Sequence, residues 1–155
     1  MTNGLKKNTG ERSTFLPLRP ALAKWTSVLL IKAADRLRHS FTSHLSPLEI
    51  HPKHYGILFL LDEQGPLSQA EIAQQVEVDR ALMVQFIDRL EQLELVERMP
   101  NPSDRRSYAV TLTHKGQEFL KQATELARTA ESEFLAPLSP EERQQLHDLL
   151  TRLLL

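Results

Sequence analysis

The sequence predicts a mostly α-helical protein with one small β-hairpin. Two observations support this fold class. Apolar residues recur at helical spacing in six segments, which capping signals and prolines delimit. Between the fourth and fifth of these segments, the period changes from that of a helix to that of a strand. The expected order is therefore four helices, a hairpin and two further helices.

The composition is that of an ordinary globular chain. The 155 residues have a net charge of −1 and contain no cysteine, which excludes disulfides, thiolate nucleophiles and cysteine metal sites. No run approaches the ~20 apolar residues of a transmembrane helix. The first residues are polar and lack the apolar centre of a secretion signal. We therefore expect a cytoplasmic protein with no membrane contact, whose residues 1–16 form a disordered tail.

The first two helices are defined by apolar patterns and by proline and glycine. The pattern from Ala21 to about Leu45 predicts the first helix, which should end before Pro47. The second helix should have Pro52 at its first position and end at Gly65. Its YGILFLL run is apolar almost all round, so we expect this helix in the middle of the core.

Two short helices follow, with about three residues between them. Ser68 and Glu71 form a capping box at the start of the first helix. Asp79 can cap the second, which we expect over Arg80–Gln92. This second helix has one apolar stripe at helical spacing, formed by Met83, Phe86, Ile87 and Leu90. Such a pair of helices predicts a helix-turn-helix.

The next two apolar segments, residues 95–99 and 108–113, alternate as strands do. The link PNPSDRRS between them is rich in turn formers and has Asp104, Arg105 and Arg106 at its tip. A guanidinium suits a narrow, electronegative minor groove, and Asp104 could orient one arginine. A solvated turn is the alternative. Placed directly after a helix-turn-helix, this hairpin predicts a winged helix-turn-helix domain.

Two helices complete the chain. Thr113 can cap the fifth helix, which Pro137 should end. Ser139 and Glu142 form a second capping box at the start of the sixth helix. We expect the sixth helix to bury its leucines, which are Leu146, Leu149, Leu150, Leu153 and Leu154.

With its apolar stripe turned inward, the Arg80–Gln92 helix directs a second face outward. The residues best placed to meet DNA bases lie in its N-terminal half and are Arg80, Ala81, Val84 and Gln85. An amide there could pair with adenine, and a small apolar side chain could contact a thymine methyl. Arg89 lies on the shoulder of this face. The charges of Asp88 and Glu91 are expected to be solvated.

The hairpin region contains three motifs, which are the LVER strand, the Asp-x-Arg pattern at Asp104 and Arg106, and the LT-x-x-G exit. Together they resemble the MarR family of winged-helix regulators, closely over about residues 52–120. The resemblance implies that Arg106 enters the minor groove. Glu77 and Glu94 stand where many relatives have glycine, and a left-handed conformation at either would cost about 1 kcal/mol.

The resemblance also implies a dimer that is joined through its first and last helices. The dimerisation helices would occupy residues 17–50 and 117–155, and the winged helix-turn-helix domain residues 51–116. Ser68 and Gln69 match positions that commonly meet phosphate. We therefore expect a homodimeric repressor that binds a pseudo-palindromic double-stranded operator and needs no cofactor.

A ligand pocket between the dimer helices and the DNA-binding lobe is a further implication of the resemblance. Trp25, His54 and Tyr55 could line it and contact a small aromatic or phenolic ligand, although each is also typical of a core or surface position. His51 and His54, near Glu49, raise the alternative of a metal site. Too few ligands accompany them, so we expect no metal.

Two other functions remain open as alternatives. One is a dimeric winged-helix adaptor that contacts only proteins, and the other is a small enzyme with a dispersed Ser/His/Asp site. We expect no enzyme, because the chain has no phosphate-binding glycine loop, no HExxH, no G-x-S-x-G and no cysteine nucleophile. The salt dependence of duplex binding separates a DNA-binding regulator from an adaptor, because phosphate contacts release counterions.

Overall fold

The structure, a computed structural model, describes residues 18–101 and 104–155, and of residues 101 and 104–107 it describes the backbone only. The tail expected at residues 1–16 lies outside this part of the chain. The chain divides into two compact units at Arg36 and Leu37, so the boundary falls inside helix α1, Thr26–Leu45.

In the first unit, α1 begins at Thr26, whereas the sequence pattern predicted a start at Ala21. The difference has a local cause. Residues 19–24 form turns, in which the Leu22 amide donates to the Arg19 carbonyl and the Trp25 amide donates to the Leu22 carbonyl. These three-residue spacings close tight turns, the Ala23 amide also donates to the Arg19 carbonyl, and the next four-residue bond, from Leu29 to Trp25, begins the regular pattern of α1.

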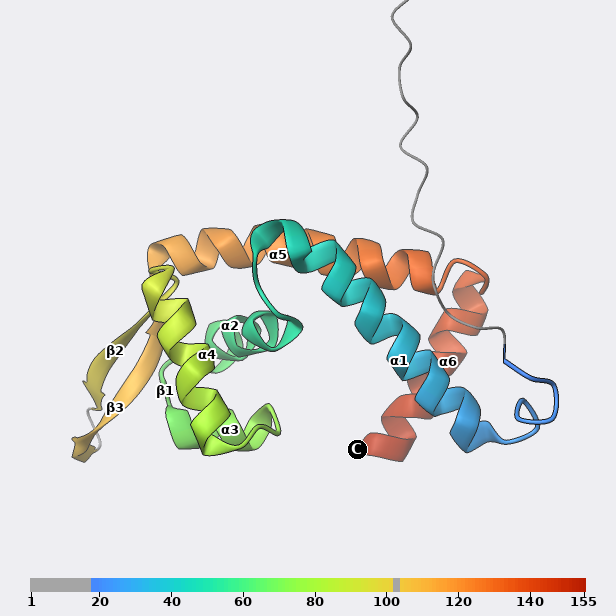
Figure 1. The fold of residues 1–155 in the computed structure, drawn as a ribbon, viewed down its shortest axis with the longest axis horizontal. Helices are drawn as coiled ribbons and strands as arrows, with labels where there is room; N and C mark the ends of the chain where they lie inside the picture. Colours follow the sequence, from blue (N-terminus) through green and yellow to red (C-terminus); the bar gives the residue numbers. More distant parts are fainter. Residues whose placement is uncertain (1–17, 102–103) are drawn as a thin grey trace, which may run out of the picture. The chain divides into compact units, whose positions relative to one another are not determined.

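The second unit contains the remaining elements of the chain (Figure 1). After α1 the order is η1 (Ser46–Leu48), α2 (Pro52–Gln64), β1 (Leu67–Ser68), α3 (Gln69–Gln75), α4 (Arg80–Gln92), β2 (Val96–Asn101), β3 (Asp104–Leu112), α5 (His114–Phe134) and α6 (Pro140–Leu154). The structure confirms the predicted mostly helical fold with a hairpin between the fourth and fifth α-helices.

The three strands form one antiparallel sheet in the order β1-β3-β2. The sequence did not predict β1, a two-residue strand in which Leu67 pairs with Val110. The strands predicted from the sequence also stop short of the hairpin tip, whereas β2 extends to Asn101 and β3 begins at Asp104. Leu95 is not in the strand, since its amide donates to the Leu90 carbonyl at the end of α4.

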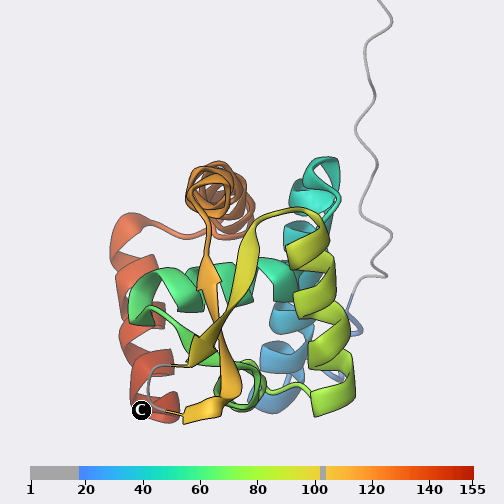
Figure 2. The same cartoon turned by 90° about the vertical axis from the view of Figure 1, so that its left-hand side faces the viewer.

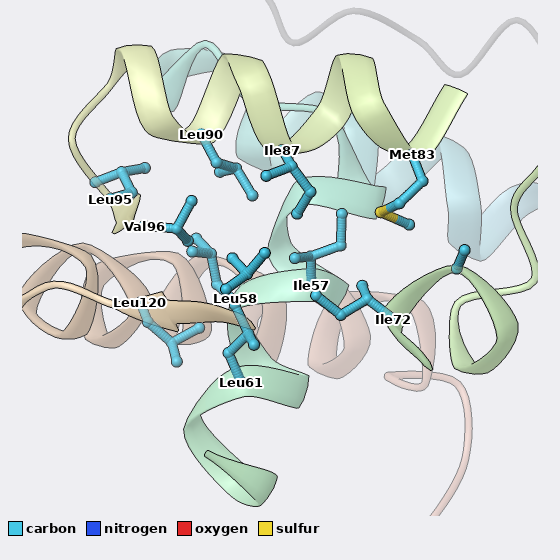
Figure 3. Packing of buried hydrophobic residues seen from close by; sticks show 12 residues of the cluster. Ile57, Leu58, Leu61, Ile72, Met83, Ile87, Leu90, Leu95, Val96 and Leu120 are labelled. Atoms are coloured by element: carbon cyan, nitrogen blue, oxygen red, sulfur yellow. The ribbon is translucent and has the colours of Figure 1, made fainter. Parts of the chain in front are cut away.

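The main core lies between α2, α4 and the sheet. Ile57 and Leu58 of α2 meet Ile87 of α4 and Val96 of β2, and all four side chains are buried (Figure 3). The prediction that α2 lies in the middle of the core is therefore confirmed. One side chain of its apolar run, Phe59, is 46% exposed and is not part of this core.

The C-terminal helices differ in burial. α5 buries one side, whereas none of the residues of α6 is buried in the single chain. The expected burial of its leucines is therefore wrong for one chain, and Leu149 and Leu153 are 56% and 71% exposed.

Among the described residues, no helix combines the length and apolarity that a membrane span requires.

Candidate nucleic-acid interface

Helix α3 starts with the predicted capping box. The Ser68 hydroxyl accepts from the Glu71 amide at 3.3 Å, and the Ser68 amide donates to the Glu71 carboxylate at 2.8 Å. Two hydrogen bonds with Ser68 lower the pKa of Glu71 below its ordinary value. The larger effect comes from the Ser68 side chain and the smaller from its backbone. These bonds fix the first turn of α3 next to the sheet, because Ser68 is also the last residue of β1.

The turn between α3 and α4 depends on a left-handed residue. Glu77 has a φ of 53°, and the Val78 amide donates back to the Ala73 carbonyl at 3.0 Å, which closes the helix end. Glu94, the other residue that stands where many relatives have glycine, is also left-handed, with a φ of 59°. Glu49, with a φ of 55°, was not anticipated.

A lysine from another helix supports the same turn. The Lys53 ammonium, at the start of α2, donates to the Val76 carbonyl at 2.5 Å. Val76 is the residue that ends α3, so a cation meets the negative end of the helix. The sequence analysis missed this contact, because 23 residues separate the two partners and no local pattern links them.

Helix α4 begins at the predicted cap, since the Asp79 carboxylate accepts from the Leu82 amide at 2.9 Å. Its predicted stripe is turned into the core, although Phe86 is only half-buried. The opposite side of its N-terminal half is exposed and includes Arg80, Ala81, Val84 and Gln85. Val84 is 42% exposed, which leaves an apolar side chain free to meet a partner.

Strand β2 is tied to α4 by charge. The Arg98 guanidinium donates to the carboxylates of Asp88 and Glu91. Burial of Arg98 works against its charged form, but its hydrogen bond to Asp88 and the charges of both carboxylates raise its pKa above the ordinary value. The expectation that the two carboxylates are merely solvated is therefore wrong. The signal for these ion pairs in the sequence was a basic residue on a strand, Arg98, that follows a helix with two acidic residues one turn apart.

The hairpin formed by β2 and β3 runs beside α4 (Figure 2). Asp104 opens β3, and its backbone pairs with that of Asn101, so Asp104, Arg105 and Arg106 continue a strand directly from the hairpin tip. The side chains of these three residues lie outside the described part of the structure. The backbone nevertheless brings this segment and α4 to one side of the second unit.

The base of the hairpin joins α4 and α5 closely. Thr113 caps α5 and donates its hydroxyl proton to the Glu94 carbonyl at 2.7 Å, and Lys115 pairs with the Glu94 carboxylate at 2.7 Å. Any side chain at Gly116 would overlap the Leu95 carbonyl. This close approach explains why the exit motif of the hairpin ends in glycine.

The proposed phosphate-contacting residues of α3 have different environments. Ser68 is engaged in the capping box, and Gln69 is half-buried. The Gln69 side-chain nitrogen is fully enclosed and has no hydrogen-bond partner among the described residues. On α4, Arg89 is half-buried, and its charge acts on His54.

The ligand-lining candidates fall in both units. Trp25 belongs to the first unit and is 66% exposed, whereas His54 and Tyr55 belong to the second. His54 is only 7% exposed and packs edge-on against Phe86 of α4, with ring centres 5.0 Å apart. Tyr55 is half-buried between the main core and the cluster around Leu45.

His54 is neutral at physiological pH. Its Nδ1 accepts from the His51 amide at 3.1 Å, and His51 in turn accepts from the Lys53 amide. Burial, followed by the charges of His51 and Arg89, lowers the pKa of His54 to about 4. Both histidines therefore use one ring nitrogen to cap α2, and no group of three metal-ligating side chains is present in residues 18–101 and 104–155.

The comparison with protein families matches residues 50–108 to the MarR family. This segment runs from the start of α2 into β3 and therefore includes both helices of the helix-turn-helix and most of the hairpin.

A curated protein of Thauera aromatica, named as a transcriptional regulatory protein for the hcr operon, is 34% identical over 104 residues. The match covers 67% of this chain and 63% of that protein, so the chain spans less than two thirds of this relative.

Two solved structures align along most of the chain. The transcriptional repressor CouR, bound to a 23-mer DNA duplex, is 30% identical, with a TM-score of 0.79 and coverage of 89% of this chain and 99% of CouR. A MarR family protein of Mycobacterium tuberculosis, in complex with salicylic acid, is 29% identical, with a TM-score of 0.71 and coverage of 83% of this chain and 96% of that chain.

Proposed function

Because the chain belongs to the MarR family, we propose that it is a transcriptional regulator that binds operator DNA as a homodimer. The observation that supports this function best is the outer face of α4. Ala81, Val84 and Gln85 are exposed and uncharged there, next to a hairpin with two arginines near its tip. A solvated helix face is usually charged, whereas uncharged side chains suit contact with base edges.

In this proposal, α4 occupies the major groove and the hairpin reaches the adjacent minor groove. The α4 residues that contact DNA are Arg80, Ala81, Val84, Gln85 and Arg89. Arg105 and Arg106 meet the minor groove, and Asp104 orients one of them. Ser68 and Gln69 at the start of α3 approach the phosphate backbone.

The homodimer is proposed to form through α1 and α6, whose exposed apolar side chains need a partner. A two-fold dimer carries two copies of α4, so the operator is a pseudo-palindrome with half-sites about 10 bp apart. Such a dimer represses transcription by occupying the promoter. The protein then acts by binding alone, with neither catalysis nor a cofactor.

A small aromatic or phenolic effector is proposed to control release from DNA. The M. tuberculosis relative is described in complex with salicylic acid, which supports this class of ligand. An effector shifts DNA binding only if it has different affinities for the DNA-competent and DNA-incompetent conformations.

The test begins with selection of bound fragments from random duplex DNA, followed by titration of the selected duplex at several salt concentrations. A DNA-binding regulator enriches a pseudo-palindrome, and its affinity falls steeply with salt because phosphate contacts release counterions. An adaptor enriches no sequence and shows no such slope. That second result would exclude the proposed function.

A further inference from the structure

The outer face of α4 has two edges with different neighbours. One edge carries Val84, Asp88 and Glu91, which recur at spacings of four and three residues and therefore share one side of the helix. Arg98 of β2 donates to both carboxylates of this row. This edge therefore borders the hairpin, which runs beside α4 (Figure 2), and Val84 is the member of the row nearest the start of α4.

The other edge of this face borders α2. It carries Leu82 and Arg89, which are about two helical turns apart. The charge of Arg89 acts on His54 of α2, which places this edge on the α2 side of the helix. Leu82 and Val84 are 40% and 42% exposed, so each edge presents an apolar side chain near the start of α4.

Val84 is suited to only one of the groups that a base pair presents. In the major groove the base edges offer hydrogen-bond donors, acceptors and a single kind of apolar group, the C5-methyl of thymine. A valine side chain has neither a donor nor an acceptor for the polar groups. Because valine branches at Cβ, it has one strongly preferred rotamer in a helix, so its methyl groups are held in position before DNA binds. An exposed valine on this face therefore favours contact with a thymine methyl.

The carboxylates of the same row are held away from the bases. A carboxylate in the major groove would accept a hydrogen bond from cytosine N4 and would repel the phosphates. α4 contains two, Asp88 and Glu91, and both are paired with Arg98. These ion pairs direct the two acidic side chains toward the hairpin. Val84 is then the member of the row that is open to a base.

From this arrangement we infer that Val84 determines specificity by contacting the methyl group of a thymine at the hairpin-facing end of each operator half-site. The inference rests on the proposed function and adds which base α4 recognises and where that base lies. Leu82, on the opposite edge, cannot make the same contact. A helix with its side chains is about 10 Å wide, whereas an apolar contact requires heavy atoms within about 4.5 Å.

The experiment first locates the hairpin on the selected duplex. The chain has no cysteine, so Met99→Cys, at an exposed position of β2, supplies a single attachment site for an iron chelate. Hydroxyl radicals from the chelate cleave the DNA next to the hairpin. Each thymine of one half-site is then replaced in turn by uracil, which differs from thymine only in lacking the methyl group, and fluorescence anisotropy measures the affinity of the unlabelled protein.

For the wild-type protein, we expect uracil to weaken binding about fourfold at one thymine beside the cleaved base pairs, because one buried methyl group is lost. Val84→Ala should bind the unmodified duplex more weakly and should not respond to this uracil. The matched control is Leu82→Ala, which also truncates an exposed apolar side chain of α4. This control should keep the full response to the same uracil.

Four results would each overturn the inference. They are no response to uracil at any thymine, a response only at thymines away from the cleaved base pairs, a response that persists in Val84→Ala, and a response that Leu82→Ala abolishes. Circular dichroism shows that the variants are folded, which is expected because both side chains are exposed and alanine favours a helix. Duplex binding without any methyl response rejects this inference alone, whereas a protein that binds no duplex rejects the proposed function itself.

Discussion

Arg106 is the residue on which the proposed minor-groove contact depends most. Its backbone lies in β3 near the hairpin tip, where a guanidinium could enter a narrow groove without moving α4. Arg106→Ala should weaken operator binding by about 1–3 kcal/mol and leave the fold intact. Fluorescence anisotropy with the selected duplex measures the affinity, and circular dichroism checks the fold. An unchanged affinity would exclude the hairpin from DNA recognition.

His54 should make the stability of the protein depend on pH. A histidine in the unfolded chain titrates near 6.5, whereas burial lowers the folded pKa of His54 to about 4. Between these values the unfolded chain binds a proton that the folded protein does not. The contribution of neutral His54 to the free energy of unfolding is therefore fully present above pH 6.5. It falls as the pH decreases through this window and levels off below about 4.

The size of this effect is measured by urea unfolding at pH 6.5 and pH 4. Between these two pH values, the free energy of unfolding of the wild-type protein should fall by about 3 kcal/mol more than that of His54→Gln, which has no titrating group at this position. The control is His147→Gln in the exposed surface of α6, which should follow the wild type. An equal loss in wild type and His54→Gln would show that His54 is not buried as a neutral side chain.

At the scale of elements, the ion pairs of Arg98 hold the hairpin against α4. Removing the guanidinium leaves Asp88 and Glu91 facing each other one helical turn apart without their common partner. Arg98→Gln should lower the free energy of unfolding by about 1 kcal/mol, and less at high salt because salt screens the charges. It should also weaken operator binding, since α4 and the hairpin must bind together.

The matched control for Arg98 is Lys115→Gln, which breaks a more exposed ion pair with Glu94 at the base of the hairpin. We expect a smaller loss of stability and unchanged operator affinity for this control. Chemical denaturation and anisotropy measure the two quantities. Equal effects of the two substitutions would contradict the specific role of the Arg98 ion pairs.

The elements that the sequence predicted well are those that local chemistry defines. Ser68, Asp79, Thr113 and Ser139 each cap the helix that was expected, because a capping side chain and its amide are within three residues of each other. The second strand of the hairpin was recognised from its alternation, although its start at Asp104 was missed.

The features that the sequence did not predict depend on partners far apart in the chain. Strand β1 exists only because it pairs with β3, more than 40 residues later. The contact from Lys53 to Val76 and the ion pairs of Arg98 likewise join separate elements. Hydrophobic periodicity identifies which residues face a core, but it does not identify such pairings.

At the scale of the whole molecule, α6 presents apolar side chains that the single chain does not bury. Leu149 and Leu153 are more than half exposed, although the helix is capped and regular. In the proposed dimer the partner covers this face, which a monomer would expose to water.

Replacing Leu149 and Leu153 together by aspartate should therefore prevent dimer formation. Analytical ultracentrifugation should show a monomer, and operator affinity should fall sharply because only one half-site can be bound at a time. The control replaces exposed Gln144 and Asp148 of α6 by alanine, which should leave the dimer intact. A normal dimer of the aspartate variant would contradict the assignment of α6 to the interface.

The most direct test of the proposed function is sedimentation of the purified protein with a labelled pseudo-palindromic duplex at low and moderate salt. We expect two chains on each duplex, protection of two half-sites about 10 bp apart, and an affinity that declines steeply as salt increases. A monomer that fails to bind the duplex even at low salt would contradict the proposal that paired copies of α4 and the hairpin recognise DNA.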